Sequence, residues 1–283
     1  MAYGIKPCEN CDAEYIWERS FESLPAEENA EQELLVFKVV DEQGTIIGGC
    51  VLDIDEMKTA EIDRLWVDER YRNLGIGSAL ICRAEQEARG KGCRSIVNTY
   101  IFDFQTAKRL FERHGYRLIG TVKDWPKGHE SYTLTKKLDC CSSTDSLAQN
   151  RFEIKPGSEE DGEIITDRLE AYNRSFVPRS HAYLDIDRKI VDDNGTMIAG
   201  CIAGVSGWDT LHVDALWVDD AYRGSNIGSY LLGEIEREAK EKGAYLSNAG
   251  GMELQAVFFI KHGYEVSVVF EDQPKWYMLH KHL

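Results

Sequence analysis

The sequence contains no apolar run long enough to cross a membrane. Its longest apolar runs are Met197–Val205 and Ala256–Ile260, whereas a spanning helix needs about 20 apolar residues. The first residues, MAYGIKPCENCDAE, also lack the basic segment and apolar stretch of a secretion signal. We therefore expect a cytoplasmic protein with no membrane partner.

Basic residues are scarce: 33 Lys and Arg stand against 49 Asp and Glu, giving a formal net charge of −16. Binding to nucleic-acid phosphates needs a basic face, so we expect no nucleic-acid partner. A cationic ligand suits the charge, although net charge governs solubility and steering rather than a particular site.

The cysteines lack the spacing of a disulfide framework. Eight are scattered over 283 residues, which indicates reduced thiols in a reducing compartment. A four-thiolate zinc site would need Cys8-x-x-Cys11 together with the adjacent Cys140-Cys141, but the second pair has no two-residue spacer. We expect free thiols and no metal site.

The chain does contain an internal repeat. Residues 65–80 read LWVDERYRNLGIGSAL and residues 216–231 read LWVDDAYRGSNIGSYL, at an offset of 151 (223 − 72). A repeat this long indicates two copies of one domain, because solenoid repeats run about 20–50 residues. Cys50 and Cys201 match across the offset within apolar strands and are expected in the two cores.

Composition predicts the domain division and the elements. Residues 139–150 turn to Cys, Ser, Thr, Asp and Gln, which is typical of a linker, so we predict domains at 1–138 and 151–283. Apolar spacing in the first copy predicts helices at 12–24, 78–89 and 106–113 and strands at 3–6, 34–40, 46–54, 61–67, 95–99, 117–122 and 131–138. The second copy repeats this order from a strand at 152–155 through a helix at 160–172 to a strand at 277–283. Each copy is therefore an α/β domain.

The turn at 72–77 is the first candidate site. It joins an apolar strand to a helix, so unpaired amides and the helix dipole would together favour an anion there. The other phosphate motifs fit poorly, because G-x-x-x-x-G-K-[ST] is absent and the spacing is not G-x-G-x-x-G.

These segments resemble the GNAT N-acetyltransferases, present as a tandem pair. The similarity lies in Arg72, Gly75 and Gly77 after the L-W-V strand end, in the later block LFERHGY at 110–116, and in the tail GTVKDWPKGH at 120–129. The resemblance implies two mixed, largely antiparallel sheets flanked by helices. It also implies that the turn holds the pyrophosphate of acetyl-CoA, the acyl donor, and that Val67 or Val218 offers an amide to the thioester carbonyl on a strand that splays from the next. The implied cofactor-binding residues are Leu65, Trp66, Val67, Arg72, Asn73, Leu74, Gly75, Ile76, Gly77, Ser78, Phe111, Val218, Arg223, Gly224 and Gly228.

Two carboxylates are candidates for the general base. Glu61 and Asp63 lie two apart in a strand and so project from one face, where either could take a proton from an amine. Both could equally be solvated surface carboxylates. His129 is the second candidate, since imidazole titrates near pH ~6.5.

The general acid is less defined. The family's tyrosine is replaced by Phe111 and Phe259, and a phenyl ring cannot donate a proton. Tyr116, Tyr100 or water could substitute, or the thiolate could leave unaided because a thiol has a pKa near ~8.5.

The two copies differ at the site. Asn226 replaces the middle glycine, and the second copy has no counterpart of His129. We therefore expect the first copy to transfer acetyl to a primary amine of a small cationic molecule or a peptide, while the second copy helps form the acceptor cleft or is degenerate. Two alternatives stay open. The chain could bind acyl-CoA without catalysis, or the second copy could be the active one, because Gly224 after Arg223 gives the start of its turn more backbone freedom.

Overall fold

The computed structural model describes residues 4–21, 32–55, 58–102, 105–138, 152–271 and 275–283. These form two compact units. One comprises 25–124 and 129–178, and the other comprises 1–24, 125–128 and 179–283. Each unit contains one copy of the repeated turn. Among the described residues, no helix is both long enough and apolar enough to span a membrane.

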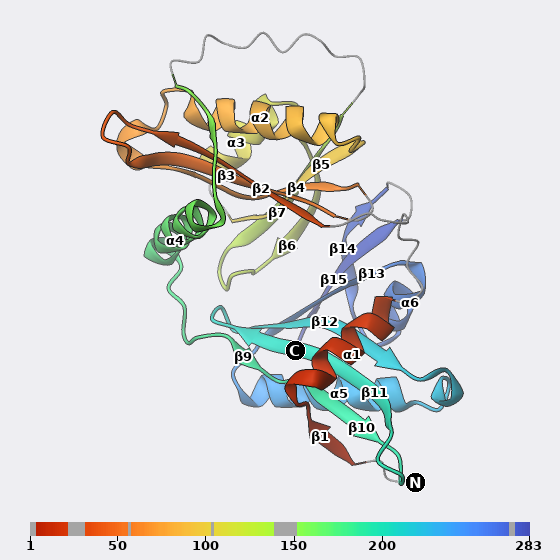
Figure 1. The fold of residues 1–283 in the computed structure, drawn as a ribbon. Coiled ribbons are helices and arrows are strands. Elements are labelled where there is room, and N and C mark those ends of the chain that lie inside the picture. The colour runs from red at the N-terminus through yellow and green to blue at the C-terminus, as the bar shows by residue number, and fades with distance from the viewer. Residues whose placement is uncertain (1–3, 22–31, 56–57, 103–104, 139–151, 272–274) are drawn as a thin grey trace. The chain divides into compact units, whose positions relative to one another are not determined.

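The first-copy unit has a seven-stranded mixed sheet (Figure 1). Its strands, in spatial order, are β6 (Arg117–Lys123), β7 (Glu130–Lys137), β5 (Ser95–Phe102), β4 (Ala60–Val67), β3 (Ile46–Ile54), β2 (Glu33–Val40) and β8 (Lys155–Pro156). Helices α2 (Ile76–Gly90) and α3 (Gln105–Arg113) lie on one face, and α4 (Glu159–Phe176) lies on the other. The predicted helices and most strands are present, with ends shifted by a few residues. The strand expected at 152–155 begins only at Lys155, because Phe152 and Ile154 pack against the core.

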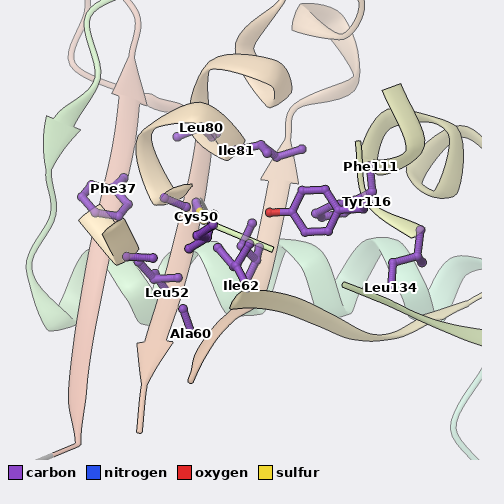
Figure 2. Close-up of a cluster of buried hydrophobic side chains, with 14 of the residues drawn as sticks. Phe37, Cys50, Leu52, Ala60, Ile62, Leu80, Ile81, Phe111, Tyr116 and Leu134 are labelled. Atoms are coloured by element: carbon purple, nitrogen blue, oxygen red, sulfur yellow. The ribbon is translucent and has the colours of Figure 1, made fainter. Parts of the chain in front are cut away.

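The core of this unit lies between the sheet and helices α2 and α3. Figure 2 shows Cys50, Ile62, Leu80 and Phe111 among its side chains. Strand residues on this face alternate with residues on the α4 face, where Val36, Val51, Trp66 and Ile165 form a second cluster. The prediction that Cys50 is a core residue is confirmed, since its side chain is fully buried.

The second-copy unit repeats the architecture. Its sheet runs β1 (Ile5–Pro7), β10 (Arg188–Val191), β11 (Met197–Ser206), β12 (Thr210–Val218), β13 (Leu246–Gly251), β15 (Trp276–His282) and β14 (Glu265–Phe270), and β9 (Leu184–Asp185) also pairs with β11. Helices α5 (Ile227–Glu241) and α6 (Glu253–Lys261) accompany this sheet, and α1 (Asn10–Phe21) packs against β11 and β12. Cys201 is fully buried here, as predicted.

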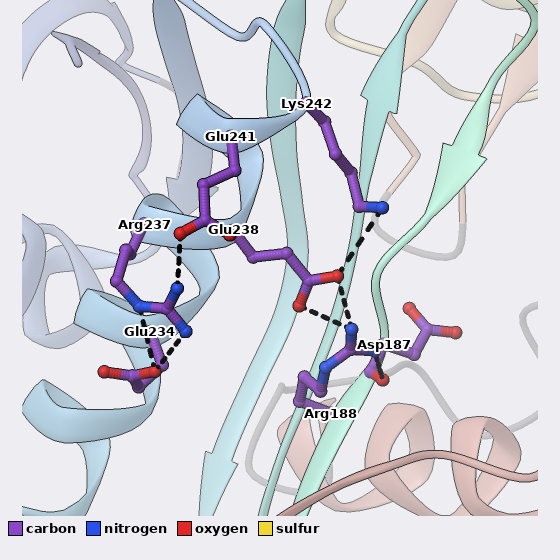
Figure 3. Close-up of polar contacts among 7 residues, drawn as sticks. All are labelled: Asp187, Arg188, Glu234, Arg237, Glu238, Glu241 and Lys242. Carbon is purple, nitrogen blue, oxygen red and sulfur yellow. Dashed lines mark hydrogen bonds and ion pairs between the residues drawn. The ribbon is translucent and has the colours of Figure 1, made fainter.

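Helix α5 is fixed to the sheet by a polar group as well as by its apolar face (Figure 3). Glu238 of α5 accepts hydrogen bonds from Arg188 of β10 and lies 3.7 Å from Lys242. On the same helix, Arg237 bridges Glu234 at 2.7 Å and Glu241 at 2.6 Å. Such exposed pairs each add only about 0.2–0.5 kcal/mol to the helix.

The first helix of each copy packs on the sheet of the other copy. Ile165 of α4 lies on Gly49 of β3, and Ile16 of α1 lies on Gly200 of β11; both isoleucines are fully buried. Ion pairs repeat across the same seams, since Lys38 contacts Asp161 and Lys189 contacts Asp12, each at 2.6 Å. The two helices are thus exchanged.

The compact units consequently differ from the division into 1–138 and 151–283 predicted from the sequence. Helix α1 and strand β1 join the second-copy sheet, whereas β8 and α4 join the first-copy sheet. The glycines at 49 and 200 leave a notch that an isoleucine from the exchanged helix fills. The predicted linker at 139–150 lies outside the described residues.

Candidate functional site

The glycine turn has the same backbone in both copies. A 3₁₀ turn, Glu69–Tyr71 or Asp220–Tyr222, leads into an arginine and then two left-handed positions. These are Asn73 (φ 63°) and Gly75 (φ 91°) in the first copy, and Gly224 (φ 77°) and Asn226 (φ 67°) in the second. Glycine and asparagine have changed places, because these are the two residue types that adopt this conformation most readily.

Helix α2 begins directly after this turn with an open N-terminus. Gly75 is the N-cap residue, and it has no side chain that could cap the helix. The hydrogen bond from the Ala79 amide to the Gly75 carbonyl, at 3.0 Å, is the first of the helix. The amides of Ile76, Gly77 and Ser78 therefore have no intrahelical acceptor. A Cβ at Gly75 would meet nothing within 4 Å, so a ligand can approach the backbone there. Leu74 beside it is half exposed.

The second glycine of the motif has a packing role. A Cβ at Gly77 would lie 3.1 Å from Leu110 of α3, and one at Gly228 would lie 3.3 Å from Val218. Each glycine lets its helix approach a neighbouring element closely.

Arg72 connects the turn to the strand before it. Its Nε donates to the Val67 carbonyl at 3.1 Å, and its Nη1 donates to the Tyr172 hydroxyl at 3.0 Å. Arg223 makes the same bond to the Val218 carbonyl at 3.1 Å. Both arginines therefore organise the turn from its strand side.

Strands β4 and β5 separate where the family resemblance implied a splay. Their parallel ladder contains only the pairs Ala60↔Ile96 and Glu61↔Val97, although both strands continue beyond them. Just past the last pair, the side-chain amide of Asn98 (Nδ2) donates to the Ile62 carbonyl at 2.5 Å, in place of a backbone bond. The second copy has four such pairs, up to Val213↔Ala249.

The backbone of Val67 faces the opened edge. The Asp68 amide donates to Ile47 of β3 at 2.9 Å, and backbone groups of successive strand residues point to opposite sides. The Val67 amide and carbonyl, and those of Leu65, therefore point to the side that β5 has left. The Trp66 side chain lies on the α4 face, with Arg168 5.4 Å from its ring centroid.

Glu61 lies at the point where the strands separate. It is paired with Asp53 across the β3–β4 ladder, and its carboxylate accepts a hydrogen bond from the Thr99 hydroxyl of β5. Burial raises the pKa of Glu61 to about 7; the carboxylates of Asp63 and Asp53 add to the rise, and the bonds from Thr99 oppose it. Half of such groups are ionised at neutral pH, as suits a general base.

Asp63 occupies a β-bulge. Val51 pairs with Arg64 and Leu52 pairs with Ile62, which leaves Asp63 as the extra residue. The simple alternation used to place it beside Glu61 therefore does not hold at this position. Burial raises its pKa, while Arg64, its ion-pair partner, opposes the rise.

The remaining candidates lie elsewhere. His129 lies on the turn before β7. The residue of β7 level with Glu61 is Thr135, because both pair with Val97 of β5. His129 is six residues from Thr135, which is roughly 20 Å along the strand. Phe111 and Tyr116 are buried in the core, with ring centroids 5.0 Å apart (Figure 2). The Tyr100 side chain, like Cys11 and the Cys140-Cys141 pair, lies outside the described side chains. Within the described part of the chain no cluster could hold a metal.

The second copy has a different environment at the position of Glu61. His212 stands there, and burial lowers its pKa to about 4. The ring of Trp125 lies 6.4 Å from the His212 ring and donates through Nε1 to the buried Thr210 hydroxyl at 2.7 Å. Nearby, the Asp214 carboxyl has a pKa raised by burial and by Asp187.

Sequence reasoning missed four residues of these sites: Thr99, Asp53, Trp125 and Tyr172. Asp53 had a signal, because a polar residue interrupts the apolar strand at 46–54. Trp125 lies within the tail at 120–129 that carries the family resemblance, but its contacts, like those of Thr99 and Tyr172, come from elements distant in the sequence.

Comparison with known proteins identifies one family for both copies. The profile described as "Acetyltransferase (GNAT) family" matches residues 4–116 and again 147–264. A blasticidin-S acetyltransferase of Streptomyces morookaense is 38% identical over 122 residues, which covers 42% of this chain and 87% of that protein. An uncharacterized N-acetyltransferase of Chlorobaculum tepidum is 34% identical over 92 residues, covering 32% of this chain and 56% of that protein.

A solved structure of similar sequence is an acetyltransferase from Bacillus cereus, 32% identical, with a TM-score of 0.44, covering 46% of this chain and 97% of that one. Acetyl-CoA is the acyl donor of the family. With both repeats matched by the family profile, the chain belongs to the GNAT acetyltransferases as a tandem of two copies.

Proposed function

We propose that the first copy transfers the acetyl group of acetyl-CoA to a primary amine of a small cationic molecule or a peptide, by direct attack in a ternary complex. The observation that carries this proposal is Glu61, a carboxylate with a pKa raised to about 7 at the separation of β4 and β5. At this position a group that can accept a proton near neutral pH lies beside an unpaired strand edge, where the thioester would bind.

The donor would lie along that edge. The amides at the start of α2 receive the pyrophosphate, because they are free and the helix dipole favours negative charge there. The Val67 amide, which points to the opened side, then donates to the thioester oxygen and stabilises the oxyanion as it forms.

The proposed acceptor site contains three acidic side chains. Asp53, Glu61 and Asp63 lie on adjacent strands and interact with one another, so a positively charged amine is attracted to this position. The net charge of −16 acts in the same direction at longer range. A relative named for acetylating blasticidin-S supports a small-molecule acceptor.

The proposed reaction proceeds by direct displacement. The amine nitrogen attacks the thioester carbonyl carbon, and Glu61 takes the amine proton directly or through water. The C–S bond then breaks and CoA leaves as a thiolate. No side-chain acid is needed, because a thiol of pKa near ~8.5 is an adequate leaving group at neutral pH; Tyr116 is buried and Phe111 carries no proton to donate.

The second copy keeps the turn and the uncapped helix start but has no carboxylate at the position of Glu61. Where Glu61 would be, His212 lies partly buried next to Trp125, and its pKa, lowered to about 4, makes it a weak base. Its turn also has an asparagine side chain, Asn226, at the second left-handed position. These observations favour the first copy as the catalytic one.

The test is thiol release from acetyl-CoA by the purified full chain across a panel of polyamines, aminoglycosides and peptides. Glu61→Gln is expected to lower kcat/KM by about 10²–10⁴-fold, and the wild-type profile should rise with pH to a plateau with an inflection near 7. His212→Asn, the matched change in the second copy, should leave the rate within about twofold. A large loss in His212→Asn with none in Glu61→Gln would assign catalysis to the second copy. Binding of acetyl-CoA with no thiol release would favour an acyl-CoA-binding protein.

A further inference from the structure

Tyr172 of helix α4 contacts the arginine that begins the glycine turn of the first copy, 100 residues away in the sequence. Its hydroxyl accepts from Arg72 Nη1 at 3.0 Å. Its ring also lies beneath the guanidinium, with Arg72 Cζ 4.2 Å from the ring centroid. One tyrosine therefore provides both a hydrogen bond and a cation–π contact to the same side chain.

The guanidinium of Arg72 in turn bridges two elements. While Nη1 contacts α4, Nε donates to the Val67 carbonyl at the end of β4. Arg72 thus closes the turn against the strand that precedes it, just before the helix start whose amides at 76–78 are proposed to receive the pyrophosphate. Its side chain is only 32% exposed.

The second copy shows the same arginine held differently. Arg223 keeps the bond to the Val218 carbonyl, and its Nη1 pairs with Asp220 at 2.7 Å, much as Arg72 Nη1 lies 3.8 Å from Glu69 at the matching position. The Arg223 side chain, however, is 62% exposed. The strand-side bond is therefore common to both copies, whereas the contact with a tyrosine of the exchanged helix distinguishes the first copy.

Helix α4 holds Tyr172 in a fixed place. Ile165, two helical turns earlier on the same face, is buried on Gly49, and Asp161 pairs with Lys38. Phe176 packs on the Tyr172 ring with centroids 4.9 Å apart. The docked helix therefore presents a restrained ring to Arg72.

We propose that Tyr172 is a positioning residue for acetyl-CoA binding: by holding Arg72, it fixes the turn 72–77 in the conformation that receives the pyrophosphate. This inference rests on the proposed function of the first copy. It means that a residue from the second half of the chain completes the donor site formed by the first half.

The experiment measures CoA and acetyl-CoA binding to the full chain by calorimetry, together with hydrogen exchange of the amides at 73–78. Tyr172→Leu removes both contacts and is expected to raise the Kd of CoA about three- to tenfold and to speed exchange in the turn. Tyr172→Phe keeps the ring and should recover most of the affinity.

Tyr15→Leu is the matched control. Tyr15 lies on the other exchanged helix and packs on Trp217 of the second-copy sheet, with ring centroids 5.5 Å apart. It should lower the melting temperature without changing the Kd. In the Arg72→Ala background, Tyr172→Leu should have no further effect on the Kd, because the partner is already gone.

The outcomes separate the two proposals. If the wild-type chain does not bind CoA, the proposed function fails. If the wild type binds and Tyr172→Leu binds equally well, or Tyr15→Leu weakens binding as much, the positioning role is wrong. Should Tyr172→Leu not fold, Arg72→Ala removes the same contact from its other side, and a Kd of CoA unchanged from the wild type in Arg72→Ala would equally overturn the positioning role.

Discussion

Ile165 occupies the space that a side chain at Gly49 would need: a Cβ built on Gly49 lies 2.2 Å from Ile165 Cδ1. The same relationship holds between Ile16 and Gly200, at 2.3 Å. In both cases a fully buried isoleucine from one copy's helix closes on a glycine of the other copy's sheet. The exchanged helices are thus seated by close contact with the backbone.

Gly49→Ala and Gly200→Ala are therefore expected to destabilise the protein by about 1–3 kcal/mol each, because the added methyl overpacks a buried seam. Urea unfolding followed by circular dichroism measures the change. Gly233→Ala is the matched control, since Gly233 is helical and a Cβ there meets nothing within 4 Å; it should be neutral or stabilising by up to about 1 kcal/mol. Equal effects at all three positions would contradict the seating by close contact.

Glu61 is expected to make stability depend on pH. Its folded pKa of about 7 lies above the ordinary glutamate value, so the folded state binds the proton more tightly than the unfolded state. The free energy of unfolding should then fall as pH rises from about 4.5 to 7, and the loss should persist above 7. Glu61→Gln should be more stable than wild type at pH 8 by about 1–3 kcal/mol, and this difference should vanish near pH 4. A pH-independent difference in denaturant titrations would argue against a raised pKa for the partly buried Glu61.

Gly75 is expected to control donor binding. Gly75→Asp places a carboxylate at a left-handed position next to the free amides of α2, so the Kd of CoA should rise at least about tenfold. Gly75→Asn reproduces the residue found at Asn226 and should keep the turn conformation, with a smaller loss. Calorimetry should show one site per chain in the wild type. Two CoA sites in the wild type, one of which remains in Gly75→Asp, would show that the second copy also binds CoA.

Trp125 is expected to keep His212 neutral. Trp125→Ala admits water, so the pKa of His212 should rise from about 4 toward about 6.5, as measured by NMR titration of the imidazole. The same change should cost about 3–5 kcal/mol of stability, because the ring is buried and bonded to Thr210. Trp125→Phe keeps a ring over His212 and should leave its pKa low. An imidazole pKa unchanged in Trp125→Ala would assign the burial to other neighbours.

The sequence predicted the local features of each copy closely. The helix at 78–89 and the strands at 34–40, 46–54 and 61–67 are present nearly as expected, because apolar spacing and turn residues act over short distances. Asn226 adopts the left-handed conformation that its side chain permits. The strand separation after Glu61 agrees with what the family resemblance implied.

Features that depend on distant partners were not predictable. Alternation could not locate the bulge at Asp63, because an extra residue is visible only in the strand pairing. Nor could it set the pKa of Glu61, which follows from burial and from the neighbours Thr99 and Asp53 on other strands.

The sequence by itself determined that this chain carries two GNAT copies, each with a strand, a glycine-bearing turn and a helix beginning, since these depend on residue type and spacing alone. Only the tertiary structure decided which sheet each first helix covers. An amphipathic pattern at 12–24 or 160–172 requires burial of one face but does not specify the partner; the notches at Gly49 and Gly200 decide it. Through that exchange, Tyr172 reaches Arg72.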